Sequence, residues 1–317
     1  MRYIDTLKEG MRISEIYLCK TKSIALTKTG KEYCNLLLQD KTGQLESKIW
    51  DMGNPGICDF EPLDYVHVEG NITVYNNANQ LSIQRIRRAE SGQYDPKDYF
   101  PTSDKNPEEM YAKLKRLVQS VQNQYLQKLL RLFFFEDTGF IKTFCAHSAA
   151  KTVHHGFIGG LLEHTLSVAE VCDLCAGHYP YVNRDLVITG ALLHDIGKTK
   201  ELSEFPSNDY TDEGQLLGHI MIGSQMVADK IKMIPGFPPK LRSEVLHLIL
   251  SHHGELEYGS PKKPALMEAM ILSFADSMDA KLETMHEALE SKPALNADGW
   301  IGFNRLLDTN LRKSCLG

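Results

Sequence analysis

The sequence predicts a chain of two parts, an N-terminal five-stranded β-barrel followed by an all-α domain. Residues 1–90 contain short alternating segments separated by turns rich in Gly and Asn. Residues 108–317 contain longer segments with apolar residues at helical spacing, and eleven of the twelve histidines lie between His147 and His286. The predicted boundaries are 1–90 for the barrel, 91–107 for a linker and 108–317 for the helical domain.

Composition limits the classes of function. The chain has 317 residues and a net charge of −6. Residues 1–90 carry 12 basic and 12 acidic side chains, so the remaining 23 basic and 29 acidic residues account for the whole charge. No global positive field therefore exists to attract duplex nucleic acid, and any nucleic-acid binding requires a local groove.

The same composition indicates a cytoplasmic protein. A membrane span needs a run of about 18 apolar residues, and the sequence has none. The N-terminus lacks the apolar core of a signal peptide. The seven cysteines are odd in number and scattered, which is typical of a reducing compartment.

Five strands are predicted in the first part, at residues 13–26, 33–39, 44–50, 65–75 and 80–88, with a last turn at 76–79. Five short strands at this spacing predict a small closed barrel. After the Pro-containing linker, Asn106 and Pro107 precede two acidic residues, which is the pattern of a helix start.

His194 and Asp195 are adjacent at the centre of the helical part. They follow the nearly all-apolar segment 186–191, so we expect them at the end of a buried helix. We expect Gly197 to end this helix in a left-handed conformation. Burying a polar group without a partner costs roughly 2–7 kcal/mol, and a metal ion is a partner for both side chains. The pair is therefore predicted to bind a metal.

Other candidate ligands lie on apolar segments of other predicted helices, and these are His164, His219, His252 and Asp276. His253 is rotated from His252 by about 100° on a helix, which makes His252 the better ligand. A single buried histidine is more often a core residue, but an ordered set favours a metal site. Nitrogen and carboxylate ligands suit Mn, Fe or Zn more than Ca.

The order His, His-Asp, His, His-His, Asp resembles the HD phosphohydrolase superfamily, in the version that holds two metals. The resemblance covers residues 155–285. It implies a first metal held by His164, His194, Asp195 and Asp276. It also implies that Asp195 bridges to a second metal held by His219 and His252.

Catalytic roles are expected for three residues of this region. In the HD superfamily the lysine that follows the His-Asp pair can reach the scissile phosphate, and here this is Lys198. Asp195 would serve both metals. We further expect His253 or His155 to donate a proton to the departing oxygen.

The segment from Tyr33 to Gly43 resembles OB-fold nucleic-acid-binding domains, with a strand, an Asp-x-Thr-Gly turn and a following strand that ends in Trp. OB folds bind single strands by stacking bases on exposed aromatic rings beside cations. The candidates are Tyr33, Trp50, Tyr75, Lys31 and Arg85, with Lys22 and Lys28 as further cations. For each aromatic ring, a place in the barrel interior is the alternative.

The order of parts resembles the YhaM-type family of bacterial 3′-5′ exoribonucleases over essentially the whole chain, and especially at residues 155–165. This resemblance implies manganese-stimulated, stepwise release of 5′-mononucleotides from the 3′ end of single-stranded RNA, and of DNA in some members. Two divalent transition-metal ions are expected, manganese first, with iron or cobalt as alternatives.

Two other functions are compatible with these motifs. One is an HD enzyme that hydrolyses a nucleotide or cyclic dinucleotide and has a regulatory barrel. The other is a non-catalytic RNA-binding adaptor. The complete ligand set argues against the adaptor, and the barrel argues against the small-molecule enzyme. The sequence leaves the oligomeric state open, with a homo-oligomer as one option.

Overall fold

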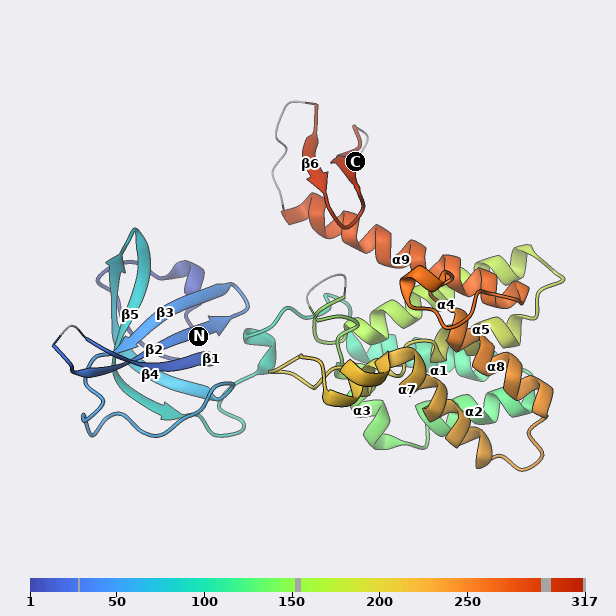
Figure 1. Cartoon of the computed structure of the whole chain (residues 1–317), viewed down its shortest axis with the longest axis horizontal. Helices are drawn as coiled ribbons and strands as arrows, with labels where there is room; N and C mark the ends of the chain where they lie inside the picture. The colour runs from blue at the N-terminus through green and yellow to red at the C-terminus, as the bar shows by residue number, and fades with distance from the viewer. Residues whose placement is uncertain (28, 152–154, 292–297, 316–317) are drawn as a thin grey trace. The chain divides into compact units, whose positions relative to one another are not determined.

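The computed structural model describes residues 1–317 except residues 28, 152–154, 292–297 and 316–317 (Figure 1). The chain divides into two compact units, Met1–Pro101 and Thr102–Gly317, and each is described by itself. The division falls within the segment that the sequence predicts to be a linker.

The first unit is a closed five-stranded barrel with the strand order β1-β2-β3-β5-β4. Strands β3 and β5 pair in parallel, and the other neighbours are antiparallel. This architecture confirms the predicted OB-like barrel. The strands are β1 Arg12–Leu26, β2 Glu32–Asp40, β3 Gly43–Ile49, β4 Tyr65–Tyr75 and β5 Ala78–Arg88, with short 3-10 helices at Ile4–Thr6 and Pro96–Asp98.

Local side-chain chemistry fixes two turns of the barrel. Asp40 accepts hydrogen bonds from the backbone N–H groups of Thr42 at 2.7 Å and Gly43 at 3.2 Å, which explains the Asp-x-Thr-Gly pattern. Asn76 and Asn77 have φ values of 50° and 61°, as a two-residue hairpin turn requires. The last turn is therefore shorter than the predicted 76–79, because β5 already begins at Ala78.

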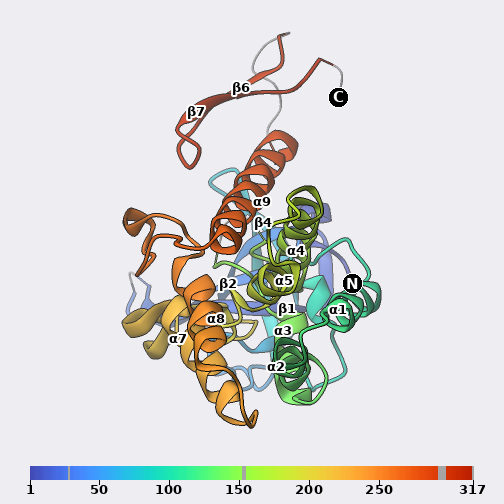
Figure 2. The same ribbon diagram turned by 90° about the vertical axis from the view of Figure 1, so that its right-hand side faces the viewer.

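The second unit is built mainly from helices around one hydrophobic core. Helix α5 lies at its centre and packs against α2, α4, α8 and α9 (Figure 2). The helices are α1 Pro107–Ser120, α2 Gln124–Phe134, α3 Thr138–Ala146, α4 Gly160–His178, α5 Arg184–Leu193, α6 Lys198–Glu201, α7 Asp212–Lys232, α8 Pro239–Ser251 and α9 Met267–Ser291, with a 3-10 helix at Leu256–Tyr258.

The predicted helix start at Asn106 is confirmed. Its side chain accepts hydrogen bonds from the N–H groups of Glu108 and Glu109, and Pro107 takes the first helical position. The all-apolar character of α5 also has its expected consequence, because every residue from Leu186 to Leu193 is buried. In the part of the chain that the structure describes, no helix combines the length and apolarity that crossing a membrane requires.

The C-terminal residues form an antiparallel hairpin that the sequence did not predict. Its strands are β6 Trp300–Asn304 and β7 Thr309–Arg312. The hairpin lies beyond the C-terminal end of α9 in both views (Figures 1 and 2). A small apolar cluster of Ala288, Ile301 and Leu311 joins the hairpin to the last turns of α9.

Candidate functional site

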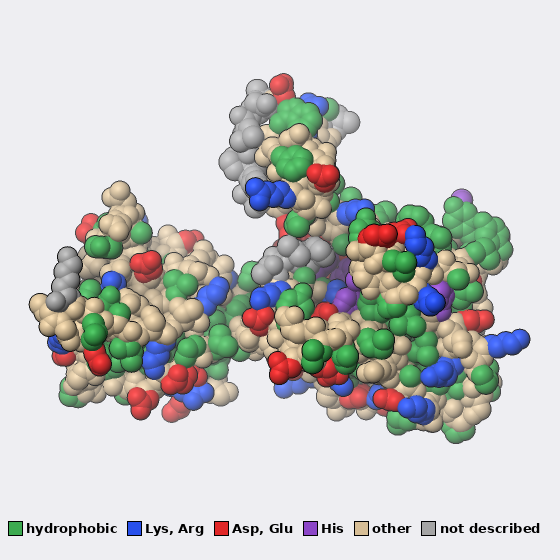
Figure 3. Space-filling view, viewed as in Figure 1, with side chains coloured by type: hydrophobic (Ala, Val, Ile, Leu, Met, Phe, Trp, Pro, Cys, Tyr) green, Lys and Arg blue, Asp and Glu red, His purple; other side chains and the backbone are tan. Residues whose placement is uncertain are grey.

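Five helices bring the six predicted ligands together in the second unit. His164 lies in α4, Asp276 lies in α9, and His194 caps the C-terminus of the buried helix α5. Asp195 follows His194 and is 2% exposed. His219 lies within α7, and His252 caps the C-terminus of α8. Histidine side chains are visible in a recess of this unit's surface (Figure 3).

The first set of side chains surrounds one carboxylate oxygen of Asp195. Its Oδ2 lies 3.3 Å from His194 Nε2 and 3.4 Å from His164 Nε2. The Oδ1 of Asp276 lies 3.2 Å from His164 Nε2. His164, His194 and Asp276 thus form a group in which each residue offers one ligand atom to a common centre.

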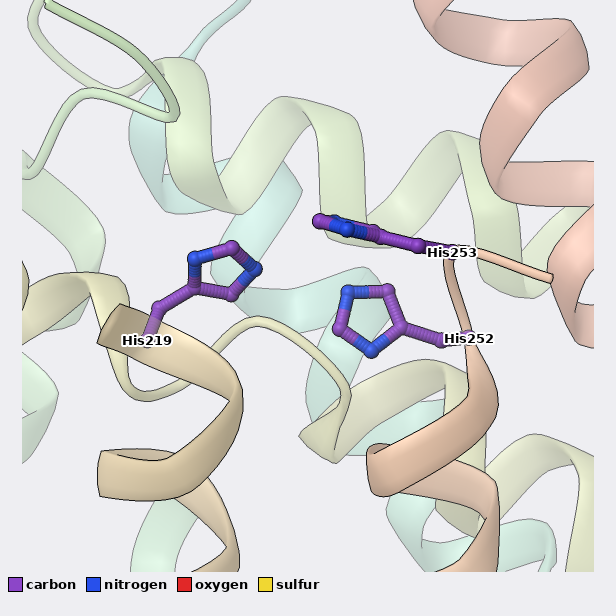
Figure 4. A group of neighbouring side chains, drawn as sticks. All are labelled: His219, His252 and His253. Carbon is purple, nitrogen blue, oxygen red and sulfur yellow. The ribbon is translucent and has the colours of Figure 1, made fainter. Parts of the chain in front are cut away.

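The second set surrounds the other oxygen of the same carboxylate. Asp195 Oδ1 lies 3.5 Å from His219 Nε2 and 3.6 Å from His252 Nε2. All three atoms are buried and have no hydrogen-bond partner among the described residues. Figure 4 shows the rings of His219, His252 and His253 lying close together where α7 and the end of α8 meet. Leaving three such atoms unpaired would cost about 1–3 kcal/mol each, so the set needs a cation.

The four histidines are held in one tautomer. In each ring, Nδ1 lies against an oxygen that can only accept. When the ring is neutral, as it must be to bind a metal, Nδ1 therefore carries the proton and Nε2 presents a lone pair to Asp195. The Nδ1 partners are Ala191 O at 2.8 Å for His194, Ile249 O at 2.7 Å for His252, Asp279 Oδ2 at 2.7 Å for His164 and Glu201 Oε1 at 3.0 Å for His219. Lone pairs facing carboxylates fit divalent cations with nitrogen and oxygen ligands.

The pKa shifts of Asp195 and His252 favour a metal site, whereas the carboxylates of Asp195, Asp276 and Asp279 outweigh burial and raise the pKa of His164 well above its usual value, so that binding of a metal would displace a proton from this ring. Burial alone would raise the pKa of Asp195, but the neighbouring Lys198 and His194 hold it well below its usual range. The Lys198 ammonium forms an ion pair with Asp195 Oδ2 at 2.6 Å. Burial and the nearby His253 lower the pKa of His252 well below its usual value, which keeps this ring neutral. An ionised carboxylate beside a neutral imidazole is ready to bind a metal.

Gly197 differs from the sequence-based expectation. Its φ and ψ are −64° and −22°, so it is right-handed, and it does not end the helix in a left-handed turn. The reason for glycine is close approach, because a Cβ atom would collide with the carbonyl oxygen of His219. Glycine therefore allows the turn after Asp195 to lie directly on the backbone of α7, next to the second ligand set.

Sequence reasoning missed two carboxylates that hold the histidines. Glu201 accepts from both the backbone N–H of His219 at 2.9 Å and its ring Nδ1. The backbone N–H of His219 is available to Glu201 because α7 is kinked at Gly218, where φ is 72° and ψ is 157°, which interrupts the hydrogen bonding of the helix. Asp279 accepts from His164 Nδ1 and from Ser167, and His155 Nε2 lies 3.2 Å away. Of these two carboxylates, only Asp279 could be noticed in the sequence, because it lies one helical turn beyond the predicted ligand Asp276.

His253 lies with the second ligand set, although a continuous helix would have rotated its side chain about 100° from that of His252. Helix α8 ends at Ser251, so the rotation of about 100° per residue does not apply beyond it. The ring centroid of His253 lies 5.1 Å from that of His219 and 4.4 Å from that of His252. Its Nδ1 lies 2.8 Å from the carbonyl oxygen of Tyr258 and donates to it, which again leaves Nε2 with a lone pair.

The predicted aromatic residues of the barrel also come together. The rings of Tyr33 and Trp50 stack with centroids 5.1 Å apart. Lys48, which the sequence did not single out, joins these rings to Tyr75. Its Nζ lies 5.2 Å, 5.0 Å and 5.8 Å from the ring centroids of Tyr33, Trp50 and Tyr75. Trp50 and Tyr75 are 45% and 60% exposed, so they do not fill the barrel interior. We call these four residues the aromatic face.

The predicted cations of the barrel lie in different surroundings. Lys31 forms an exposed ion pair with Asp51 at 3.3 Å, next to Trp50 in the sequence. Lys22 donates to the carbonyl oxygen of Phe60 and lies over its ring. Among the described residues, no contact joins Arg85 to the aromatic face. Lys28 lies outside the described residues.

Comparisons with known proteins agree with the two units. The HD domain family matches residues 161–281. The 3′-5′ exoribonuclease YhaM of Geobacillus sp. (strain WCH70) is 36% identical over 89% of this chain and 86% of that protein. The protein of that name from Bacillus subtilis (strain 168) is 34% identical over 89% of this chain and 88% of its own length. The one from Listeria monocytogenes serotype 4b (strain CLIP80459) is 35% identical over 93% of this chain and 94% of its own length. The chain therefore belongs to the YhaM family of 3′-5′ exoribonucleases.

Proposed function

We propose that this chain is a metal-dependent 3′-5′ exoribonuclease that shortens single-stranded RNA, and DNA as a second substrate, to 5′-mononucleotides. Membership of the YhaM family supports the reaction. The observation that carries the proposal is the placement of four histidine rings, whose Nδ1 atoms lie against acceptor oxygens and whose Nε2 atoms face the two oxygens of Asp195. Such a centre is suited to divalent cations, and bound divalent cations promote the hydrolysis of phosphodiesters by water.

We assign the ligands to two ions that share Asp195. The first ion takes His164, His194 and Asp276, and the second takes His219 and His252. Manganese is the proposed metal, with iron or cobalt as alternatives, because imidazole and carboxylate together suit these ions. Glu201 and Asp279 hold His219 and His164 from behind, as outer carboxylates do in other metal sites.

The bound ions would supply Lewis-acid activation of water and charge neutralisation at the phosphate. The residues of the chain then orient the substrate and adjust the charge. Lys198 provides a fixed positive charge beside Asp195, within reach of a phosphate bound at the centre. The side chains are largely buried, which limits competing solvent and strengthens each electrostatic interaction.

The predicted role of His253 as a proton donor has little support. Its Nδ1 proton is committed to Tyr258 O, and burial together with the nearby His219 lowers the pKa of its ring. A neutral ring of this tautomer offers Nε2 only as an acceptor. We therefore propose His253 as a further nitrogen of the second ligand set, in place of a general acid.

We propose that the aromatic face of the barrel holds the strand. Stacking on rings such as Trp50 contributes about 1–3 kcal/mol per base without regard to sequence, and Lys48 can contact the phosphates. The face lies on strands β2 and β3 and beside the β4–β5 turn, where OB folds bind oligonucleotides. The scattered, unpaired cysteines support the cytoplasm as the place of action.

One assay tests the activity. The full chain is incubated with Mn²⁺ or EDTA and one of three substrates: a 5′-labelled RNA with a free 3′ end, the same RNA with a blocked 3′ hydroxyl, or a cyclic dinucleotide. We expect a ladder that shortens from the 3′ end only with the first RNA and only with Mn²⁺. Internal cuts in the blocked RNA would indicate an endonuclease. Turnover of the cyclic dinucleotide alone would indicate a small-molecule HD enzyme.

A further inference from the structure

Helix α9 presents an apolar ridge on the side away from the metal centre. The ridge consists of Met270, Phe274, Met278 and Leu282, spaced four residues apart, so that they follow one another along the helix surface. Their exposed fractions are 44%, 69%, 43% and 58%. We call these four residues the α9 ridge.

The opposite face of α9 is occupied. It packs against α4, α5 and α8, with Leu272 and Ala275 buried there and Asp276 turned to the metal centre. The inner face thus already serves the core and the site, and no packing requirement of the described unit explains four large apolar side chains on the outer face. A soluble helix normally carries polar residues on such a face.

We propose that the α9 ridge pairs with the α9 ridge of a second copy of this chain, in an antiparallel two-fold dimer. The ridge is symmetric about its middle. In an antiparallel pair, Phe274 meets Met278 of the second copy, and Met270 meets Leu282 of the second copy. Side chains spaced four residues apart form a continuous ridge that can pack into the groove of a facing helix. A self-complementary patch of this kind generates the two-fold dimer, which is the commonest oligomer.

The C-terminal hairpin supports the same partner. A two-stranded hairpin is marginally stable by itself, and β6–β7 is joined to its own chain through a small cluster near Leu311. It nevertheless exposes Phe303 by 55% and Leu306 by 67%. Because the hairpin lies beyond the C-terminal end of α9, antiparallel pairing delivers it to the N-terminal end of the other α9, where Met267 is 52% exposed (Figures 1 and 2).

The available area agrees with a specific dimer. Large apolar side chains carry on the order of 150–200 Å² each, and about half of each ridge side chain is exposed. Two ridges then bury on the order of 700 Å². The hairpin side chains bring the total to about 1,000 Å², which is the lower range for a specific interface.

The test measures the mass of the intact protein in solution by analytical ultracentrifugation across the micromolar range. We expect the wild type to have twice the chain mass of 35.8 kDa. Phe274→Glu should be a monomer that still cleaves RNA and melts cooperatively. The matched control is Leu174→Glu on α4, where the side chain is 76% exposed, and it should remain a dimer.

A charge pair identifies the partner as a second copy. In the antiparallel arrangement, adding Met278→Lys to Phe274→Glu places opposite charges across the two-fold axis and should restore the dimer, whereas Phe274→Glu with Met278→Glu should not. A monomeric wild type, or a Phe274→Glu protein that stays dimeric, would overturn the proposal. A monomeric wild type whose RNA affinity falls on Phe274→Glu would assign the ridge to the nucleic acid.

Discussion

In the helical unit, the proposed ligands are buried and each histidine ring is fixed from behind by an oxygen atom, whereas in the barrel three partly exposed rings share one lysine. In the helical unit, a hydrogen bond at Nδ1 fixes the orientation of each of the four histidine rings. The aromatic face consists of Tyr33, Trp50 and Tyr75 around Lys48, with water on one side. This difference suggests that the buried centre is preorganised for chemistry and that the aromatic face adapts to any base.

The largest effect should come from Asp195, because its two oxygens face both ligand sets. Asp195→Asn should reduce the rate of RNA cleavage by about a thousandfold or more, since several kcal/mol of transition-state stabilisation are lost. Binding of a long RNA to the aromatic face should change little. Single-turnover cleavage and fluorescence anisotropy measure the two quantities. A variant that cleaves normally would place the chemistry elsewhere.

Substitution of Glu201 tests whether the hydrogen bond at Nδ1 of His219 is needed to position this ring for metal binding. Glu201→Ala should weaken binding of the second ion by about 10–100-fold, as is usual for an outer carboxylate, and excess Mn²⁺ should restore much of the rate. Glu201→Gln keeps an acceptor for the N–H groups of His219 and should show a smaller loss. Glu213→Ala, which removes an exposed acid from the first turn of α7, is the matched control. Metal titration by calorimetry compares the three. Equal affinities would show that Glu201 does not position His219.

Gly197 tests how tightly the buried centre is packed. Gly197→Ala places a methyl group against the carbonyl oxygen of His219, so it should lower the free energy of unfolding by about 1–3 kcal/mol. Gly177→Ala in α4 meets no atom within 4 Å and should be neutral or stabilising. Urea denaturation distinguishes the two variants. If both behaved alike, the close approach of the two backbones would not be a constraint in solution.

The smallest effects are expected on the barrel. Trp50→Ala and Lys48→Ala should each weaken binding of a long single strand by roughly tenfold, in line with about 1–3 kcal/mol per stacked base. The rate of cleavage at saturating RNA should be unchanged. Arg85→Ala serves as the control, because no described contact joins it to the aromatic face. If Arg85→Ala had the larger effect, the strand would follow another path over the barrel.

The same contrast explains how far the sequence alone could reach. His194 and Asp195 stand out because they are polar residues directly after a buried, apolar helix, and local spacing is enough to find them. Glu201 and Lys48 do not stand out, because their importance depends on contacts with residues far along the chain. Gly197 was noticed, but its reason was missed, since the collision that excludes a side chain involves the distant His219. His253 was expected in the site as a proton donor and not as a ligand, because the helical rotation used to rank it does not apply beyond Ser251, where α8 ends.

The most direct test of the shared-carboxylate centre is the number of metal ions per chain, measured by elemental analysis after Mn²⁺ loading and gel filtration. We predict two ions for the wild type, one for His219→Ala and none retained by Asp195→Asn, with circular dichroism showing that both variants are folded. One ion in the wild type, or an unchanged count in His219→Ala, would contradict the assignment of two ligand sets to the two oxygens of Asp195.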